Sequence, residues 1–165
     1  MKWFDRAFEF NMPVWMGQNL MERLRGTPAR LEERLDGVSE QVLKARPNGE
    51  WSIQENVGHL IDLEPLWYGR IGDILGGETV MRPADLENRK THEADHNARS
   101  LDGLLEEFRA ERKKLMERLD ELSESQLDAA SLHPRLEQPM RILDLMFFVA
   151  EHDDHHLAQI SRLLG

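Results

Sequence analysis

Hydrophobic residues recur every three or four positions along most of this chain, a spacing typical of amphipathic helices. Four long segments follow the pattern, and we expect each to form a helix: residues 13–36, 52–75, 100–122 and 139–164. The alternating pattern of strands is almost absent. Four amphipathic helices with two longer connections predict an all-α fold, a four-helix bundle.

The second helix has the clearest boundaries. Ser52 and Glu55 form a capping box at its start, and Gly76 and Gly77 end it. The following connection, residues 78–99, is polar and carries His92 and His96. A connection of this length favours a functional segment or a lid over a simple linker. Charged residues crowd the third helix, and we expect them to form a solvated face.

Prolines affect the expected course of the first and the last helix. Pro28 follows Thr27, a good N-cap, so the first helix is expected to kink or restart there. Pro139 suits the first position of the last helix. Short helical turns are expected at residues 39–44 and 123–128, and residues 133–135 are expected to form a loop.

Composition narrows the classes of function. The 165 residues carry a net charge of −10, which disfavours nucleic-acid binding. Cysteine is absent, so a metal site would need histidine nitrogens and carboxylate oxygens, and a reducing cytoplasmic location is expected. No apolar run is long enough for a signal peptide or a membrane span. The length favours one domain over residues 1–165.

The histidines of the last helix are the strongest chemical signal. His152 and His156 are four residues apart, so both lie on one helical face, within the stripe of Leu145, Met146 and Val149. His155 falls at the rim of that stripe. Two inward imidazoles are difficult to satisfy without partners, and one metal ion would satisfy both. Core packing of the two rings is the alternative that the spacing leaves open.

A tight site needs a third ligand from another helix. His59 lies within the second helix, on a shoulder beside its main apolar stripe, so periodicity alone leaves its burial open. His92 and His96 are also four apart, and they fit either a second metal site or lid, or simply a solvated loop.

The sequence resembles the DinB-like superfamily at two places. The segment Trp-Ser-Ile-Gln-Glu-Asn-Val-Gly-His-Leu at 51–60 and the pattern His152-x-x-x-His156-Leu-Ala-Gln159 match that family in order and spacing. The resemblance implies a four-helix bundle that binds one divalent metal ion through His59, His152 and His156. It also implies that His155 and Gln159 lie close to the ion without being ligands.

Several functions are consistent with this resemblance. Some relatives of this kind are thiol-dependent transferases or isomerases, others have been proposed as hydrolases, and many have no known reaction. A small-molecule substrate, a low-molecular-weight thiol and a homodimer are therefore expected. Zinc is the first candidate metal and nickel the second. Asp62 is a candidate partner for the His59 ring, and Glu55, Asp62, Asp153 and Asp154 are candidate general bases. A non-catalytic bundle that binds a small ligand or a protein partner is the alternative.

Overall fold

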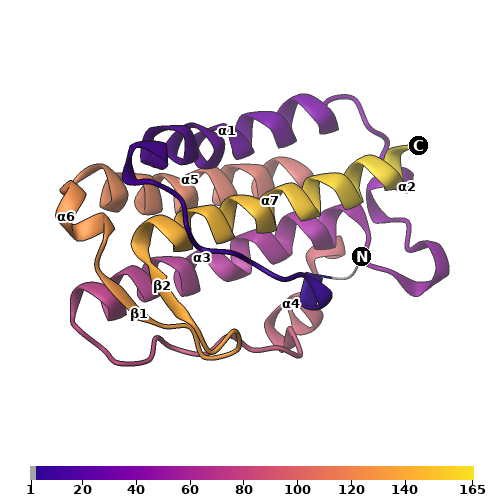
Figure 1. Ribbon diagram of the computed structural model, residues 1–165. Coiled ribbons are helices and arrows are strands. Elements are labelled where there is room, and N and C mark those ends of the chain that lie inside the picture. Colours follow the sequence, from indigo (N-terminus) through magenta and orange to yellow (C-terminus); the bar gives the residue numbers. More distant parts are fainter. Residues whose placement is uncertain (1–2) are drawn as a thin grey trace.

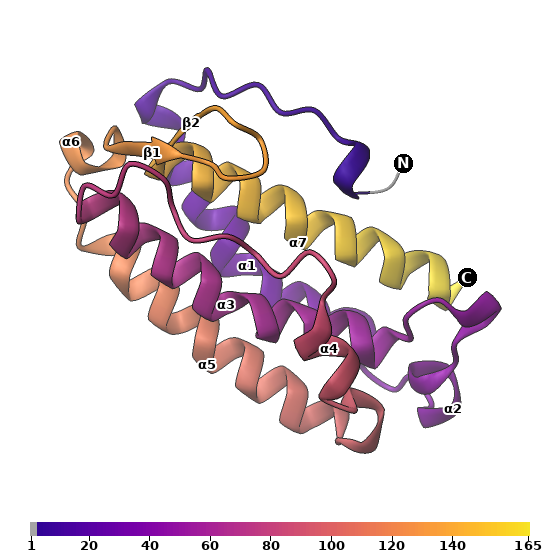
Figure 2. The ribbon, with the colours of Figure 1, turned by 90° about the horizontal axis from the view of Figure 1, so that it is seen from below.

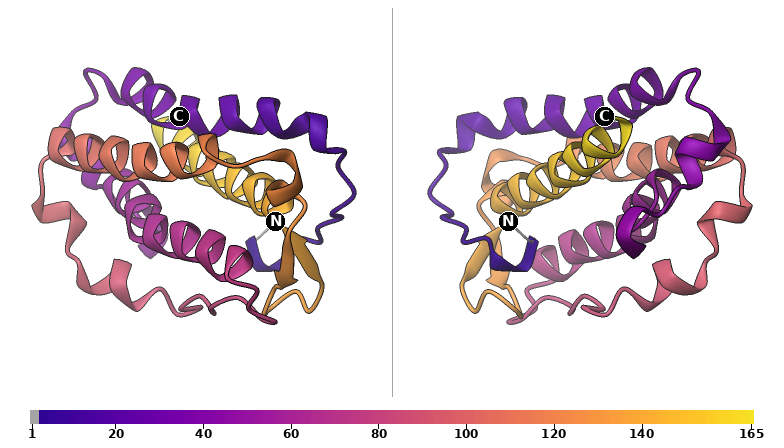
Figure 3. Two further views of the ribbon diagram at one scale, coloured as in Figure 1. Left: turned by 90° about the vertical axis from the view of Figure 1, so that its left-hand side faces the viewer. Right: turned by 90° about the vertical axis from the view of Figure 1, so that its right-hand side faces the viewer.

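The computed structural model describes residues 3–165 and contains four long helices (Figure 1). They are α1 (Gly17–Leu35), α3 (Ile53–Leu75), α5 (Leu101–Asp120) and α7 (Ile142–Leu164). Both α1 and α3 pack chiefly against α5 and α7. Figure 3 shows the consequence, because α1 and α3 lie on opposite sides of the bundle. The expected four-helix bundle is confirmed, with α1 placed diagonally from α3, whereas α3 and α5 pack side by side.

Short elements connect the long helices. The expected turns form α2 (Glu40–Lys44) and α6 (Glu124–Leu127). Within the 78–99 connection, α4 (Arg89–Glu93) packs against α3, as Figure 2 shows. Four 3₁₀ turns complete the helical elements: η1 (Trp3–Asp5), η2 (Val14–Met16), η3 (Pro47–Gly49) and η4 (His96–Ala98). None of the helices described combines the length and the apolar character needed to cross a membrane.

The start of the last helix differs from the prediction. Pro139 is not its first residue, because Pro139–Arg141 forms strand β2, antiparallel to β1 (Ala130–Leu132). The helix begins at Ile142, where the Asp144 carboxylate accepts a hydrogen bond from the backbone N–H of Arg141. Three-residue strands are too short to show an alternating pattern, so the hairpin could not be predicted from the sequence.

The first helix starts later than expected, at Gly17, and it runs through Pro28 without restarting. Proline has no N–H, so the carbonyl of Leu24 loses its helical donor. Arg112 supplies the missing hydrogen bond, since its Nη1 lies 2.9 Å from that carbonyl oxygen. The side chain of a neighbouring helix therefore compensates for the proline.

A buried polar layer divides the hydrophobic core into two clusters. Each long helix contributes one side chain: Thr27, Glu64, Arg112 and Asp153, all at most 2 % exposed. The Arg112 guanidinium donates to both carboxylates, and the Thr27 hydroxyl donates to Asp153. Arg112 was expected on a solvated face, and its burial corrects that expectation. Burial raises the pKa of Glu64, whose Oε2 has no hydrogen-bond partner among residues 3–165.

Candidate metal centre

Three histidines from two helices converge beside this polar layer. His59 comes from α3, and His152 and His156 lie one turn apart on α7. All three are buried, and each offers a ring nitrogen within 4.8 Å of the nitrogens of the other two. The ring centroids are 4.6–5.3 Å apart. The structure thus brings together the three residues that the resemblance singled out, and it settles the open question of whether His59 is buried.

Hydrogen bonds fix the orientation of the His59 ring. Its Nδ1 lies 3.0 Å from the hydroxyl oxygen of Thr91, and that hydroxyl donates to the Asp62 carboxylate at 2.9 Å. Because the hydroxyl proton is directed at Asp62, the Thr91 oxygen accepts from His59 Nδ1–H. The Nε2 atom of His59 then carries the lone pair. Asp62 acts on His59 through Thr91 rather than by direct contact.

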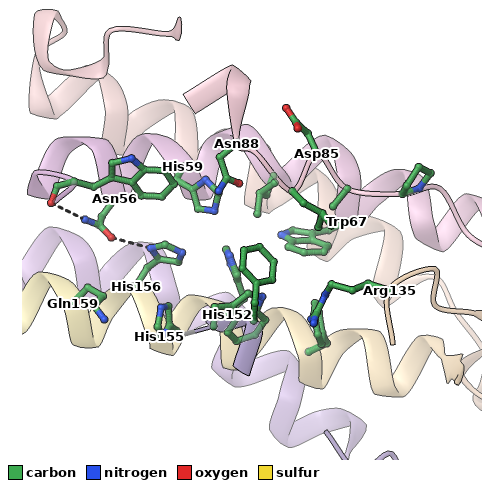
Figure 4. A pocket seen from close by; sticks show the side chains of 18 of the residues that line it. Asn56, His59, Trp67, Asp85, Asn88, Arg135, His152, His155, His156 and Gln159 are labelled. Atoms are coloured by element: carbon green, nitrogen blue, oxygen red, sulfur yellow. Dashed lines mark hydrogen bonds between the residues drawn. The ribbon is translucent and has the colours of Figure 1, made fainter. Parts of the chain in front are cut away.

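A second network fixes His156 in the same way. Its Nδ1 donates to Oδ1 of Asn56 at 2.8 Å (Figure 4). The Asn56 amide nitrogen donates to the carbonyls of Trp51 and Ser52, which sets the orientation of the amide. His156 therefore also presents an unprotonated Nε2. The side chain of Asn56 was not among the residues that the sequence singled out.

His152 is held by packing rather than by hydrogen bonds. The rings of Trp3 and Trp67 meet it edge-on at centroid distances of 5.0 and 5.6 Å. Its Nδ1 is buried and has no hydrogen-bond partner among the described residues. A buried imidazole nitrogen without a partner costs free energy. This cost is the kind that coordination to a metal ion removes.

All three imidazoles are electrically neutral near pH 7. Burial lowers the pKa of His59 to about 4 and places the pKa values of His152 and His156 well below the ordinary value. The neighbouring histidines lower them further. Neutral imidazole is the form that binds metal ions. The donor set, the ring orientations and the protonation states therefore all fit one divalent ion.

The three rings face a large cavity. Its volume is about 1080 Å³, and it is lined by residues from α3, α7, the N-terminal segment and the loops around Asp85 and His133. The half-buried His155 lines it too, with its ring centroid 5.3 Å from that of His156. Gln159 also lines the cavity, although its side chain accepts from Arg162 and does not bond to the imidazoles.

The other candidate carboxylates are engaged elsewhere. Glu55 completes the capping box with Ser52 and pairs with Arg46. Asp154 pairs with Arg23 and Arg30, and Asp153 belongs to the polar layer. None of these carboxylates is available as a general base at the histidine cluster.

His92 and His96 do not form a second site together. His92 is exposed, whereas His96 is buried with its Nε2 2.9 Å from the Asp62 carboxylate. The His96 ring packs on Gly58, where a Cβ atom would lie only 2.2 Å from Cγ of His96. His96 thus attaches the 78–99 connection to α3 next to Thr91, which is the contact that orients His59.

A known protein family matches most of this chain. The model of the DinB superfamily matches residues 23–160, which include all three converging histidines. The chain belongs to the DinB superfamily. No curated protein is significantly similar to this DinB chain.

Two solved structures share the fold of this DinB chain. YfiT from Bacillus subtilis, described as a probable metal-dependent hydrolase with an unusual four-helix bundle topology, superposes with a TM-score of 0.84 at 21% identity. That match covers 96% of this chain and 91% of YfiT. A protein from Streptococcus pneumoniae gives a TM-score of 0.68 at 14% identity, over 95% of this chain and 91% of its own. At these identities the likeness establishes the fold.

Proposed function

We propose that this DinB chain is a metal-dependent hydrolase of a small molecule, with one divalent ion held by His59, His152 and His156. The convergence of three neutral imidazoles at the wall of a large cavity carries the proposal. Three histidine ligands leave coordination positions free, an arrangement found in catalytic zinc sites. Zinc is the first candidate and nickel the second. The description of YfiT as a probable metal-dependent hydrolase supports the same reaction class.

Residues of this chain have distinct tasks in such a reaction. A bound divalent ion supplies Lewis acidity toward a substrate oxygen and activates water for attack. Thr91 and Asn56 hold the imidazoles in one tautomer, so the Nε2 atoms of His59 and His156 remain directed at the site. His155 lies beside His156 without a role as a ligand, and in this proposal its imidazole takes a proton from the attacking water and gives it to the leaving group.

The walls of the cavity select a small organic substrate. Trp51 packs against His59 at a centroid distance of 4.7 Å, and Trp67 packs against His152. These rings exclude water from one side of the histidine cluster. The cavity volume is slightly above the usual range for small-molecule sites. Space for a second molecule supports transfer of a low-molecular-weight thiol as a second candidate reaction.

A metal and activity assay tests the proposal. Protein without a histidine tag is stripped with chelator and reloaded with zinc or nickel, and each form is assayed on activated esters and amides with and without a small thiol. We expect one equivalent of metal and metal-dependent hydrolysis that His156→Ala abolishes. Turnover that requires the thiol would indicate the transferase. Absence of both metal binding and turnover would contradict the proposal and favour a non-catalytic binding protein.

A further inference from the structure

Arg70 is a buried cation without a bonded counter-ion. It is 1 % exposed, and no carboxylate among residues 3–165 hydrogen bonds to it. Its Nε donates to the carbonyl of Arg82, and its Nη1 lies 3.1 Å from Nε2 of His133. The nearby Asp73 carboxylate is engaged by three hydrogen bonds from Arg82. Buried charges in proteins are normally paired, so the arrangement lacks an anion.

The contacts of His133 also lack a hydrogen-bond acceptor. The Nδ1 atom accepts from the backbone N–H groups of Arg135 and Leu136, at 3.2 and 3.1 Å. A neutral imidazole has one acceptor nitrogen, so Nε2 must carry the proton. That Nε2–H then faces the guanidinium of Arg70, which is also a donor. An acceptor placed beside both His133 and Arg70 would satisfy both groups.

A second guanidinium completes the cluster. The Nη2 atom of Arg135 is buried and has no hydrogen-bond partner in the described part of the chain. Burial lowers the pKa of Arg135, and it lowers that of Arg70 to about 10, which keeps Arg70 cationic near pH 7. Arg70, His133 and Arg135 all line the cavity that holds the histidine cluster. Figure 4 shows Arg135 at the Trp67 end of that cavity, beyond His152 from His156.

Helix geometry connects this cluster to the candidate metal centre. Arg70 follows His59 by eleven residues on α3, which is three turns, so both lie on one face with Cα atoms about 16 Å apart. Trp67 and Phe148 line the cavity between them. The Arg70 guanidinium lies over the Trp67 ring, 5.6 Å from its centroid, and Trp67 contacts His152. An elongated molecule with an apolar middle fits this path.

We propose that Arg70, Arg135 and His133 form a subsite for the carboxylate of an organic anion that lies along Trp67 and Phe148. The assignment of its opposite, reacting end to the histidine cluster rests on the proposed function. The subsite itself rests on the unpaired donors. The substrate class is therefore an elongated carboxylic acid with an apolar segment between its anionic and reacting groups.

Binding of a matched pair of probes tests this subsite. We would titrate 4-phenylbutanoate and its neutral amide, 4-phenylbutanamide, into wild type, Arg70→Met and Arg162→Met by calorimetry. Arg162 lines the same cavity but pairs with Glu50, so its variant removes an equal charge from an already compensated position. We expect wild type and Arg162→Met to prefer the acid by about tenfold or more, and Arg70→Met to lose that preference.

The titrations are done on both metal-free and zinc-loaded protein. A preference for the acid that persists without metal locates the carboxylate at Arg70, whatever the outcome of the hydrolysis assay. A preference that disappears with the metal would place the carboxylate on the ion and overturn the subsite. Equal binding of acid and amide by wild type, or an unchanged preference in Arg70→Met, would overturn it as well.

Three further measurements apply if Arg70→Met does not fold. Arg135→Met should weaken the preference for the acid, and Arg70→Lys should weaken it as well, because a buried ammonium does not replace the forked donors of the guanidinium. In wild type, ¹⁵N NMR should show the His133 proton on Nε2 when 4-phenylbutanoate is saturating, with a shift of that nitrogen on binding. No change in the His133 signals at saturation would contradict the proposal.

Discussion

The Nδ1 atom of His156 lies 2.8 Å from Oδ1 of Asn56, a residue 100 positions earlier in the chain. This bond fixes the tautomer of an imidazole that we assign to the metal. Asn56→Ala should therefore lower zinc affinity by roughly 10- to 100-fold, measured by competition with a chromophoric chelator. Asn88→Ala is the control, since Asn88 lines the cavity without bonding to the three histidines. Unchanged affinity in Asn56→Ala would contradict the assigned role.

Metal content should depend on the three clustered histidines and not on the total count of histidines in the chain. His59→Ala and His156→Ala should each lose the bound equivalent after dialysis, while His92→Ala should keep it because His92 is exposed and outside the cluster. Elemental analysis of untagged protein measures this. Chelation should also lower the melting temperature of wild type, since zinc at about 100 times its Kd adds about 2.7 kcal/mol of stability. Full metal content in His156→Ala would exclude the site.

Thr91 should influence the metal through His59. Thr91→Val removes the oxygen that accepts from His59 Nδ1 and also the donor to Asp62, with little change in side-chain volume. We expect zinc binding to weaken by about tenfold or more. Thr91→Ser keeps the hydroxyl and should bind zinc like wild type. Equal weakening in the two variants would indicate a packing effect instead of an oriented hydrogen bond.

The polar layer should be sensitive to loss of its cation. Arg112→Met leaves two buried carboxylates without their partner and should lower the free energy of unfolding by about 3–5 kcal/mol. Arg109→Met, on the same helix, breaks a more exposed pair with Glu32 and should cost less than about 1 kcal/mol. Urea denaturation of the two variants measures the difference. Similar losses in both would show that burial does not decide the effect.

His133 predicts a pH dependence of stability. Burial and the charges of Arg70 and Arg135 lower the pKa of His133 to about 3, whereas the unfolded chain has the ordinary value near 6.5. Below about pH 6.5 the unfolded state therefore binds this proton first, and the free energy of unfolding falls as the pH falls toward 3.

The titration of His133 should lower the free energy of unfolding by roughly 2 to 3 kcal/mol by about pH 4.5. Above about pH 7 it should have no effect. Urea denaturation of metal-free wild type and His133→Gln measures it. The variant should lose less stability than wild type over this range, because the other buried histidines are present in both proteins. Parallel pH profiles would contradict the assigned pKa.

Local patterns in the sequence predicted the frame of the molecule. The capping box at Ser52 and Glu55 is present in α3, and His152 and His156 are buried as the apolar stripe of α7 predicts. Both features depend on neighbours within four residues, which periodicity can read. The proline at position 139 misled for the same reason, since its local preference is satisfied equally well at the edge of a hairpin.

Features that depend on tertiary contacts could not be predicted from local sequence patterns. The burial of His59 required knowledge of which helices flank α3, and Thr91 lies in a polar loop whose position against α3 no periodicity encodes. In the sequence Arg112 is one of many charged residues of α5, and only the fold places Glu64 and Asp153 against it. The contact of Arg70 with His133, 63 residues further along the chain, likewise arises from the fold.

The absence of a side chain at Gly58 has a consequence for how this protein can vary. The imidazole of residue 96 occupies the space that even one methyl group would need. Alanine at position 58 would push the loop outward and withdraw the hydroxyl that steadies His59. Replacing glycine by alanine, a net gain of one CH₂ group, would thus disturb His59, a proposed metal ligand, through His96 and Thr91, so the residue tolerated at position 58 depends on the histidine cluster as well as on helix stability.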